Sequence, residues 1–313
     1  MRIAFFGTPD FSVPTLERVL EGPHEVVVAV TQPDRRRGRG RKTSPSPVAR
    51  VAARAGIPLL RPEAVGDEEA VGTLRDAAPD LGVVVAFGQF LPKTVRELPT
   101  RGYCINAHAS LLPRHRGAAP IAHALLAGDA STGVTVMRVE REMDAGPVAL
   151  ARETPIGSED DTGTLGERLA VLAADAVAAA LDRIVAGTLA WTEQDPALAT
   201  LAPRIERSDA VLDFGQDAVA LARRVRAMAP KPGARTTFAG EPLRILAAKP
   251  GLRNLGHDPG RVVREGDSVF VATGRGTLEL LRLQRAGGKP LETAAFLRGH
   301  EIPDGTLLGE PPA

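Results

Sequence analysis

The sequence has little sulfur and few large aromatic rings. Its 313 residues include one cysteine, Cys104, with one tryptophan and one tyrosine. A single cysteine excludes an intramolecular disulfide and a zinc site built on cysteines. We therefore expect a cytoplasmic protein, from a reducing compartment, with a core of aliphatic side chains.

Export and membrane signals are also missing from the sequence. The first residues, MRIAFFGTPDF, read as a strand and not as a charged segment followed by a long apolar one, so we expect no signal peptide. No apolar run reaches the length of a membrane span. The turn after the first strand reads GTP, without a G-x-G-x-x-G pattern, which counts against a nicotinamide-dependent dehydrogenase, the fold-level alternative.

The charge of the chain is balanced as a whole and uneven locally. The net charge is +1, with 22 basic and 25 acidic side chains in residues 1–203 and 17 and 13 in residues 204–313. Six Lys or Arg residues accompany one acid in segment 34–42, and ten accompany two acids in segment 223–264. Two basic segments indicate an anionic partner, and nucleic acid is the commonest large one.

The first 150 residues alternate apolar runs with helical patterns such as VPTLERVL and SPVARVAARAG. Continuous apolar runs, RIAFFG, EVVVAVTQ and LGVVVAF, are typical of strands buried on both faces of a parallel sheet. Further strands are expected at YCINAHA, GVTVMRV and PVALARETPI, followed by an alanine-rich helix at 164–186. The pattern predicts an α/β, Rossmann-like domain with a mostly parallel sheet over residues 1–203.

The pattern changes after a connector and a short helix expected at 217–228. Short strands follow one another at intervals of about 8–12 residues, with Gly and Pro between them, which is typical of a small barrel or sandwich. We expect residues 204–313 to form a smaller, five-stranded, OB-like β-barrel. Its basic segment suits a polyanion.

The segment INAHASLLPRHRGAAP, residues 105–120, carries the clearest chemical signal. Asn106 and His108 are two residues apart and therefore point to one face of a strand, where it gives way to a Pro/Gly loop. Ligands bind at this carboxyl edge in open α/β sheets. Asp144 lies in a Gly-Pro loop after a second apolar strand.

Each of these residues has an ordinary explanation when taken alone, as a surface histidine or a solvated acid in a turn. Together they supply what acyl transfer to an amine needs, because an oxyanion must be stabilised and a proton must leave the nitrogen. Asn106 and a protonated His108 would donate to the acyl oxygen. Asp144 would raise the basicity of the imidazole and order a water.

Other reactive side chains near this segment have simpler interpretations. Cys104 precedes Asn106 on the same strand and is expected to be a small buried hydrophobe, not a nucleophile. His115 and His123 are expected on a loop and a helix, without Cys or acidic partners at ligand spacing. We therefore expect no metal site.

HASLLPRHRGAAP with the downstream MDAGP resembles the 10-formyltetrahydrofolate-dependent formyltransferases. The resemblance, over nearly all of residues 1–200, implies catalytic roles for Asn106, His108 and Asp144 and 10-formyltetrahydrofolate as the formyl donor. It also implies a folate site in the SLLP segment and a pterin-cradling loop in VVAFGQFLP. Those residues are Ser110, Leu111, Leu112, Pro113, Phe87, Gly88, Gln89, Phe90 and Leu91.

Within the family, GTPDFSVPTLE, TQPDRRRGRGRKTSPSPVA and PKPGART resemble members that formylate the methionyl amine of initiator tRNA. The second segment resembles a loop that grips the acceptor stem, which implies tRNA contacts by Arg35, Arg36, Arg37, Arg39, Arg41 and Lys42. It departs from the family where Arg36 and Arg37 replace a Pro and a small residue, and where Thr43 and Ser44 replace a more apolar pair. Its charge suits phosphate contacts on physical grounds, although a solvated tether is the alternative.

Two other functions stay open. The first is the same chemistry on a small amine, such as a nucleotide-sugar or glycinamide ribonucleotide; the arginine loop counts against the sugar and the chain length against the ribonucleotide. The second is a non-catalytic RNA-binding protein, against which the intact Asn106, His108 and Asp144 count. We expect a monomeric enzyme, with no membrane partner, whose substrate is initiator methionyl-tRNA.

Overall fold

A computed structural model describes residues 1–37 and 42–309 of the chain, with backbone alone for 35–37, 42 and 43. The chain divides into two compact units. The first unit comprises Met1–Pro120, Ser131–Pro155 and Gly166–Pro203, and the second comprises Ile121–Ala130, Ile156–Leu165 and Arg204–Ala313. No helix in the described part of the chain is both long and apolar enough to cross a membrane.

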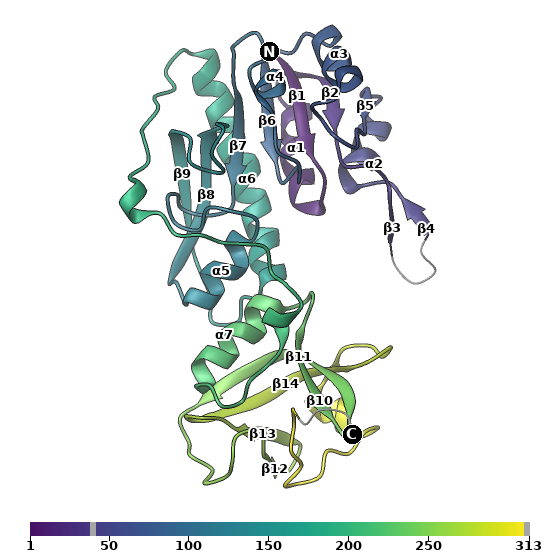
Figure 1. Cartoon of the computed structure of the whole chain (residues 1–313), viewed down its shortest axis with the longest axis vertical. Coiled ribbons are helices and arrows are strands. Elements are labelled where there is room, and N and C mark those ends of the chain that lie inside the picture. Colours follow the sequence, from purple (N-terminus) through teal and green to yellow (C-terminus); the bar gives the residue numbers. More distant parts are fainter. Residues whose placement is uncertain (38–41, 310–313) are drawn as a thin grey trace. The chain divides into compact units, whose positions relative to one another are not determined.

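A seven-stranded sheet forms the centre of the first unit, in the order β5-β2-β1-β6-β7-β8-β9 (Figure 1). All neighbours pair in parallel except at β8, which runs antiparallel to both β7 and β9. The mostly parallel sheet predicted from the sequence is therefore confirmed. Its strands are β1 (Arg2–Gly7), β2 (Glu25–Val30), β5 (Leu59–Leu60), β6 (Leu81–Val85), β7 (Cys104–His108), β8 (Ser131–Arg138) and β9 (Val148–Pro155).

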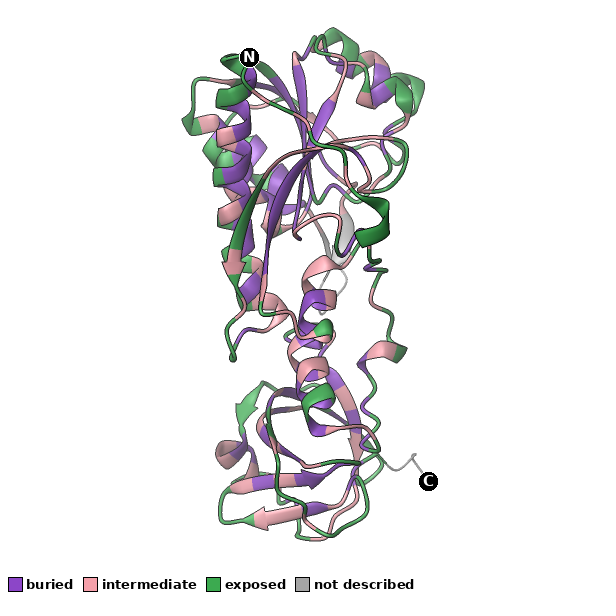
Figure 2. Cartoon of the chain, turned by 90° about the vertical axis from the view of Figure 1, so that its left-hand side faces the viewer, coloured by how far each residue is buried: buried purple, intermediate pink, exposed green. Residues whose placement is uncertain are grey.

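The apolar runs of the sequence are the central strands of this sheet. All five residues of β6 are buried, and so are five of the six in each of β1 and β2. Figure 2 shows the central strands largely buried and the helices exposed on their outer faces, whereas the edge strand β9 has no buried residue. The helices that begin in or belong to this part of the chain are α1 (Val13–Glu21), α2 (Pro47–Arg54), α3 (Glu68–Asp76), α4 (Lys93–Arg96), α5 (Pro120–Ala127) and α6 (Thr162–Val185), with a short 3-10 helix, η1 (Asp10–Ser12).

The arginine-rich segment contains a hairpin of two short strands, β3 (Arg35–Arg37) and β4 (Lys42–Ser44), which extends away from the sheet (Figure 1). The strands pair antiparallel, with Arg35 opposite Ser44. Arg39 and Arg41 lie outside the described residues. The base of the hairpin is anchored by buried hydroxyl groups, because Thr31 Oγ1 lies 2.7 Å from Ser46 Oγ, and Ser46 Oγ also caps α2.

The second unit is built on an antiparallel sheet in the order β10-β11-β14-β13-β12, with β15 paired to β14. Helix α7 packs on β11 and buries Leu221, Val225 and Met228. The elements are α7 (Ala218–Met228), β10 (Ala234–Phe238), β11 (Glu241–Gly251), β12 (Val262–Glu265), β13 (Ser268–Ala272), β14 (Thr277–Arg285), β15 (Leu291–Glu292) and α8 (Thr293–Leu297). Two further 3-10 helices are η2 (Pro196–Leu198), in the first unit, and η3 (Ser208–Ala210).

Two segments from before residue 204 belong to the second unit, namely 121–130, which includes most of α5, and 156–165. Thr162 Oγ1 donates to the carbonyl oxygen of Ala227 at 2.7 Å, and Arg226 Nη1 donates to the Gly157 carbonyl at 3.1 Å. The second unit therefore depends on more of the chain than its carboxyl-terminal residues.

Candidate active site

The carboxyl end of β7 carries the amide and the imidazole of the predicted site. Strand β7 lies between β6 and β8, with Asn106 opposite Val84 on one side and Met137 on the other. Asn106 is half-buried and His108 is buried. The Asn106 amide makes no hydrogen bond to another described residue, so a donor and an acceptor are left available at the strand end.

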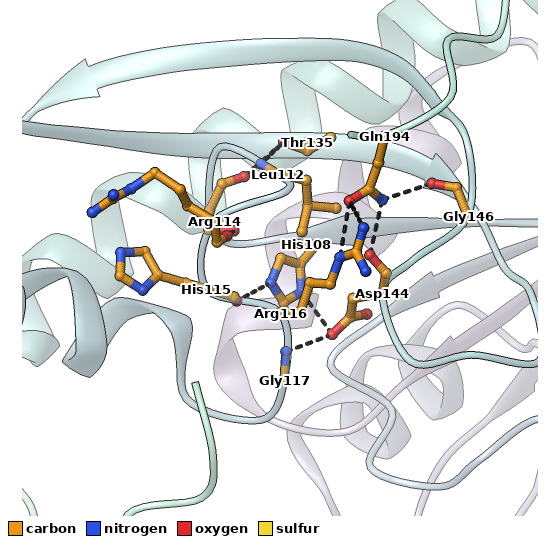
Figure 3. Close-up of polar contacts among 11 residues, drawn as sticks. His108, Leu112, Arg114, His115, Arg116, Gly117, Thr135, Asp144, Gly146 and Gln194 are labelled. Atoms are coloured by element: carbon orange, nitrogen blue, oxygen red, sulfur yellow. Dashed lines mark hydrogen bonds and ion pairs between the residues drawn. The ribbon is translucent and has the colours of Figure 1, made fainter. Parts of the chain in front are cut away.

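The His108 ring is fixed between two oxygen atoms (Figure 3). Its Nε2 lies 2.8 Å from the carbonyl oxygen of His115, and its Nδ1 lies 3.5 Å from Asp144 Oδ2. A carbonyl only accepts, so Nε2 carries a hydrogen in this arrangement. With an oxygen beside each nitrogen, the doubly protonated ring is the form that donates on both sides.

Asp144 lies in the loop between β8 and β9, and a backbone amide of another loop holds its carboxylate. Its φ is 52°, a left-handed conformation that Asp tolerates better than most residues, and its Oδ2 accepts from the Gly117 amide at 2.9 Å. A Cβ on Gly117 would lie 2.6 Å from the Ala202 carbonyl oxygen, and one on Gly146 would lie 2.1 Å from that of Arg138. Both loops approach neighbouring backbone too closely for a larger residue, and this close packing brings Asp144 to His108.

The SLLP segment is tied to β8 through one threonine. Thr135 Oγ1 donates to the Ser110 carbonyl at 2.7 Å and accepts from the Leu112 amide at 3.1 Å. Ser110 is fully buried and its hydroxyl donates to the Arg114 carbonyl at 2.6 Å. Leu111, Leu112 and Pro113 are half-buried, so their apolar side chains are what this segment presents to a ligand.

The loop after β6 divides into buried and exposed residues. Phe87 packs edge-on against Phe6 with ring centroids 5.6 Å apart, and Leu91 belongs to the same core. The Gln89 amide is used internally, because its Oε1 accepts from the Val65 amide and its Nε2 donates to the Pro62 carbonyl. Gly88 is exposed and the Phe90 side chain is 59% exposed, so these two residues are the ones open to a ligand.

Arg116 and Gln194 complete the site, and neither was among the predicted site residues. Arg116 donates to Gln194 Oε1 from Nε at 3.1 Å and from Nη2 at 2.8 Å. Gln194 Nε2 in turn donates to the carbonyls of Asp144, at 2.9 Å, and Gly146, at 2.7 Å (Figure 3). Arg116 stands inside the motif, but Gln194 is 50 residues from Asp144 and no spacing rule points to it.

Residues 186–203, which follow α6 and are called the connector here, contain Gln194 and run beside the loop that follows the SLLP segment. Thr200 accepts from the His115 amide through Oγ1, and from the Arg116 amide through its carbonyl, both at 2.8 Å. The Ala202 amide donates back to the Arg116 carbonyl at 2.7 Å. The connector is therefore hydrogen-bonded along the loop that carries the His108 partner, and it is part of the site.

Cys104 is fully buried, as the sequence predicts, and burial raises the pKa of its thiol to about 12. We expect alkylation or disulfide exchange at pH 8 to be at least ~100-fold slower in the folded protein than in denaturant, because only the thiolate of an accessible cysteine reacts. The unfolded thiol ionises at a lower pH than the folded one, so stability should fall as the pH rises from about 9 toward 12. Fast labelling of the native protein would contradict the burial of this thiol.

The geometry of the site is that of a group-transfer enzyme. An amide with no hydrogen-bond partner among the described residues stands at the carboxyl edge of a mostly parallel sheet, beside a buried imidazole paired with a half-buried carboxylate. This arrangement is suited to group transfer at a carbonyl carbon. Among residues 1–37 and 42–309, no group of three or more His, Cys, Asp or Glu side chains is placed to hold a metal ion.

Known proteins narrow this class. The family described as formyl transferase matches residues 1–181, and the formyl transferase C-terminal domain matches residues 204–301. The methionyl-tRNA formyltransferase of Pseudomonas paraeruginosa is 45% identical over 316 aligned residues, which cover 99% of this chain and 100% of the relative. The chain belongs to the formyl transferase family, and within it to the methionyl-tRNA formyltransferases.

Solved structures at lower identity share the fold. HypX from Aquifex aeolicus, in complex with tetrahydrofolic acid, is 20% identical with a TM-score of 0.66, and the match covers 98% of this chain and 50% of HypX. An N-formyltransferase from Helicobacter canadensis, in complex with folinic acid and dTDP-3-aminofucose, is 14% identical with a TM-score of 0.63, covering 89% of this chain and 97% of that enzyme. These likenesses concern the architecture alone.

Proposed function

We propose that the protein transfers the formyl group of 10-formyltetrahydrofolate to the methionyl amine of initiator methionyl-tRNA, for translation initiation. The observation that carries the proposal is the contact of the buried His108 ring with Asp144 beside the Asn106 amide, within a chain that aligns end to end with a methionyl-tRNA formyltransferase. We place the enzyme in the cytoplasm and expect it to act as a monomer.

The three side chains divide the chemistry of the transfer. The donor supplies a formyl carbon bonded to a nitrogen leaving group, and the new bond from the methionyl nitrogen replaces that bond. Asn106 is free to donate to the formyl oxygen as charge develops there. Each ring nitrogen of His108 faces a protein oxygen, so His108 donates to a substrate oxygen only when that oxygen takes the place of the His115 carbonyl or the Asp144 carboxylate. Of these two contacts, the 3.5 Å contact with Asp144 is the weaker one.

Asp144 suits the task of moving the proton. Its Oδ2 is fixed by the Gly117 amide, while Oδ1 makes no hydrogen bond to another described residue. Oδ1 therefore accepts from a water that takes the proton of the attacking amine, and the leaving nitrogen receives a proton in return. A carboxylate held by backbone groups keeps this geometry through the reaction.

The folate site that we propose uses the SLLP segment and the loop after β6. The half-buried side chains of Leu111, Leu112 and Pro113 give an apolar surface, and Gly88 and Phe90 are exposed on the neighbouring loop. We assign indirect roles to the other members of the set. Phe87 and Leu91 support the loop from the core, Gln89 fixes its path, and Ser110 fixes the SLLP turn.

For the second unit we propose an OB-like barrel that binds tRNA, so that residues 1–203 serve folate and catalysis and residues 204–313 serve RNA. The register of β11 against β14 shifts between Ile245 and Ala248, and such bulges bend strands in the way that barrels need. The segments 121–130 and 156–165 join this unit as structural support.

The arginine hairpin gives the first test of the RNA substrate. Replacing Arg39 with Ala should weaken the use of charged tRNA, and the slope of log affinity against log salt should become shallower by about 0.9, which corresponds to one phosphate contact. Arg75→Ala removes an exposed cation from α3 and serves as the control. An unchanged salt slope and KM in the Arg39 variant would reduce the hairpin to a tether.

Direct assay decides between the candidate substrates. Labelled formyl transfer from 10-formyltetrahydrofolate is measured to charged initiator tRNA, with charged elongator methionine tRNA and a nucleotide-linked amino sugar as competing acceptors. We expect transfer to initiator tRNA alone. Transfer to the sugar would favour the small-amine alternative, and no transfer to any acceptor would favour a non-catalytic RNA-binding protein.

A further inference from the structure

Gln194 occupies the centre of a hydrogen-bonded bridge around the Asp144 loop. Its single side-chain amide uses both ends: Nε2 donates to two carbonyls of the loop, and Oε1 accepts two bonds from Arg116. The two carbonyls belong to Asp144 and Gly146, on either side of Ala145, so the amide closes the turn. Hydrogen bonds from a single group to both sides of a turn restrict its backbone angles together.

The turn needs such support because its backbone is strained. Asp144 has a φ of 52°, in the left-handed region that is strained for residues other than glycine and persists only where the surrounding structure holds it. The adjacent Met143 is 64% exposed, so apolar packing does not hold this side of the loop. The Gln194 amide and the Gly117 amide are the groups that hold the Asp144 backbone and its carboxylate.

Arg116 connects this support to the loop that orients His108. The Arg116 guanidinium is buried and donates to Gln194 Oε1 from Nε and Nη2, while its backbone amide and carbonyl pair with Thr200 and Ala202 of the connector. The preceding residue, His115, has a φ of 59° and offers its carbonyl to His108 Nε2. The partners of both ring nitrogens therefore depend on the same Arg116–Gln194 contact.

We propose that Gln194 is a positioning residue for the transfer reaction, which sets the Asp144 carboxylate against His108 through the two loop carbonyls. This inference rests on the proposed function. It gives the connector a task in the first unit beyond joining two parts of the chain, because its residues hold both loops of the site. Gln194 touches no reacting atom and acts through Asp144.

Two substitutions of Gln194 test whether its hydrogen bonds to the Asp144 loop are needed for the reaction. Gln194→Glu keeps an oxygen for Arg116 but sets an acceptor against the two loop carbonyls, whereas Gln194→Met removes all four bonds at similar length. Both should lower kcat about tenfold to a hundredfold, because buried acceptors lose their donor and the carboxylate moves. The KM values for folate and tRNA should stay within about twofold. Glu193→Gln, on the exposed neighbour, is the matched control.

A double-mutant cycle with Asp144→Asn distinguishes positioning from a general structural role. If Gln194 acts through the Asp144 carboxylate, Gln194→Met should change kcat less than about twofold once that carboxylate is gone. An equal loss of kcat in both backgrounds would overturn the proposal, and so would a lowered Tm with kcat per folded molecule unchanged. Absence of formyl transfer in the unchanged chain would instead refute the proposed function.

A variant that removes both polar partners separates an effect on kcat from an effect on folding stability. Arg116→Leu combined with Gln194→Met leaves no unpaired guanidinium, so its Tm should lie closer to that of the unchanged chain than the Tm of Gln194→Met alone. We expect kcat to stay low in this double variant, and the 15N resonances of the His108 ring to shift from their original positions. Recovery of kcat together with Tm would show that Gln194 serves stability alone.

Discussion

Replacing Asp144 with Asn, or His108 with Ala, is expected to lower kcat by roughly 10²–10⁴ with folate binding nearly unchanged, because acid–base groups act mainly in the transition state. The asparagine keeps the shape of the side chain and can still accept from Gly117, so the loss is one of charge and basicity. Asn106→Ala should behave similarly, since it removes a donor to the developing oxyanion. Single-turnover rates at saturating folate measure the chemical step directly.

Glu142→Gln is the matched control for Asp144→Asn. Glu142 lies in the same loop, its side chain is 82% exposed, and its only ion pair is a 4.0 Å contact with Arg116 within the described part of the chain. Neutralising it should leave kcat within about twofold. Near-normal turnover in His108→Ala or Asp144→Asn would show that the catalytic assignment is wrong.

The strands and the main helices of the first unit could be predicted because local sequence determines them. The run RIAFFG has no polar residue after Arg2, and a segment of this kind is stable only when both faces are covered, as they are in β1. The expected helices at 164–186 and 217–228 correspond to Thr162–Val185 and Ala218–Met228. In each case the apolar periodicity lies within the element itself, and Asp217 caps the second helix from the position just before it.

The hairpin β3–β4 and the contacts of Gln194 could not be predicted from local sequence. Arginine and lysine have little strand preference, so the pairing of Arg35 with Ser44 has no periodic signal, and the sequence suggested a plain loop. Gln194 meets Asp144 only because the connector returns along the 113–119 loop, which is a tertiary event. His108 and Asp144 could be predicted as partners because an imidazole and a carboxylate together serve acyl transfer, although the two residues are far apart in the sequence.

The organisation of the second unit changes how its RNA binding should be tested. Deleting residues 204–313 would remove the strands and α7 while leaving 121–130 and 156–165, which belong to the same unit, without their packing partners. The Ala127 carbonyl of α5 would then lose the hydrogen bond that it accepts from Arg223 Nη1. A truncated chain is therefore expected to unfold in part, and charge neutralisation in the full chain is the cleaner experiment.

Neutralising the exposed cations of the second unit should cost the largest share of tRNA affinity. Four side chains from the basic segment are exposed and change to Gln together: Lys231, Arg244, Lys249 and Arg253. If each meets a phosphate, the salt slope should fall by about three to four and affinity at moderate salt by roughly 10²–10³-fold, while folate binding stays unchanged. Lys249 and Arg253 also pair with Glu159 and Glu265, so the Tm is checked in parallel.

The control removes the same charge from the first unit. Four exposed cations of that unit change to Gln: Arg54, Arg75, Lys93 and Arg101. Net charge falls equally in both variants, so long-range attraction to RNA weakens equally, and only direct phosphate contacts distinguish them. We expect a salt slope close to that of the unchanged chain in the control. Equal losses in the two variants would mean that residues 204–313 attract tRNA through net charge alone, and the arginine hairpin would then be the remaining direct contact.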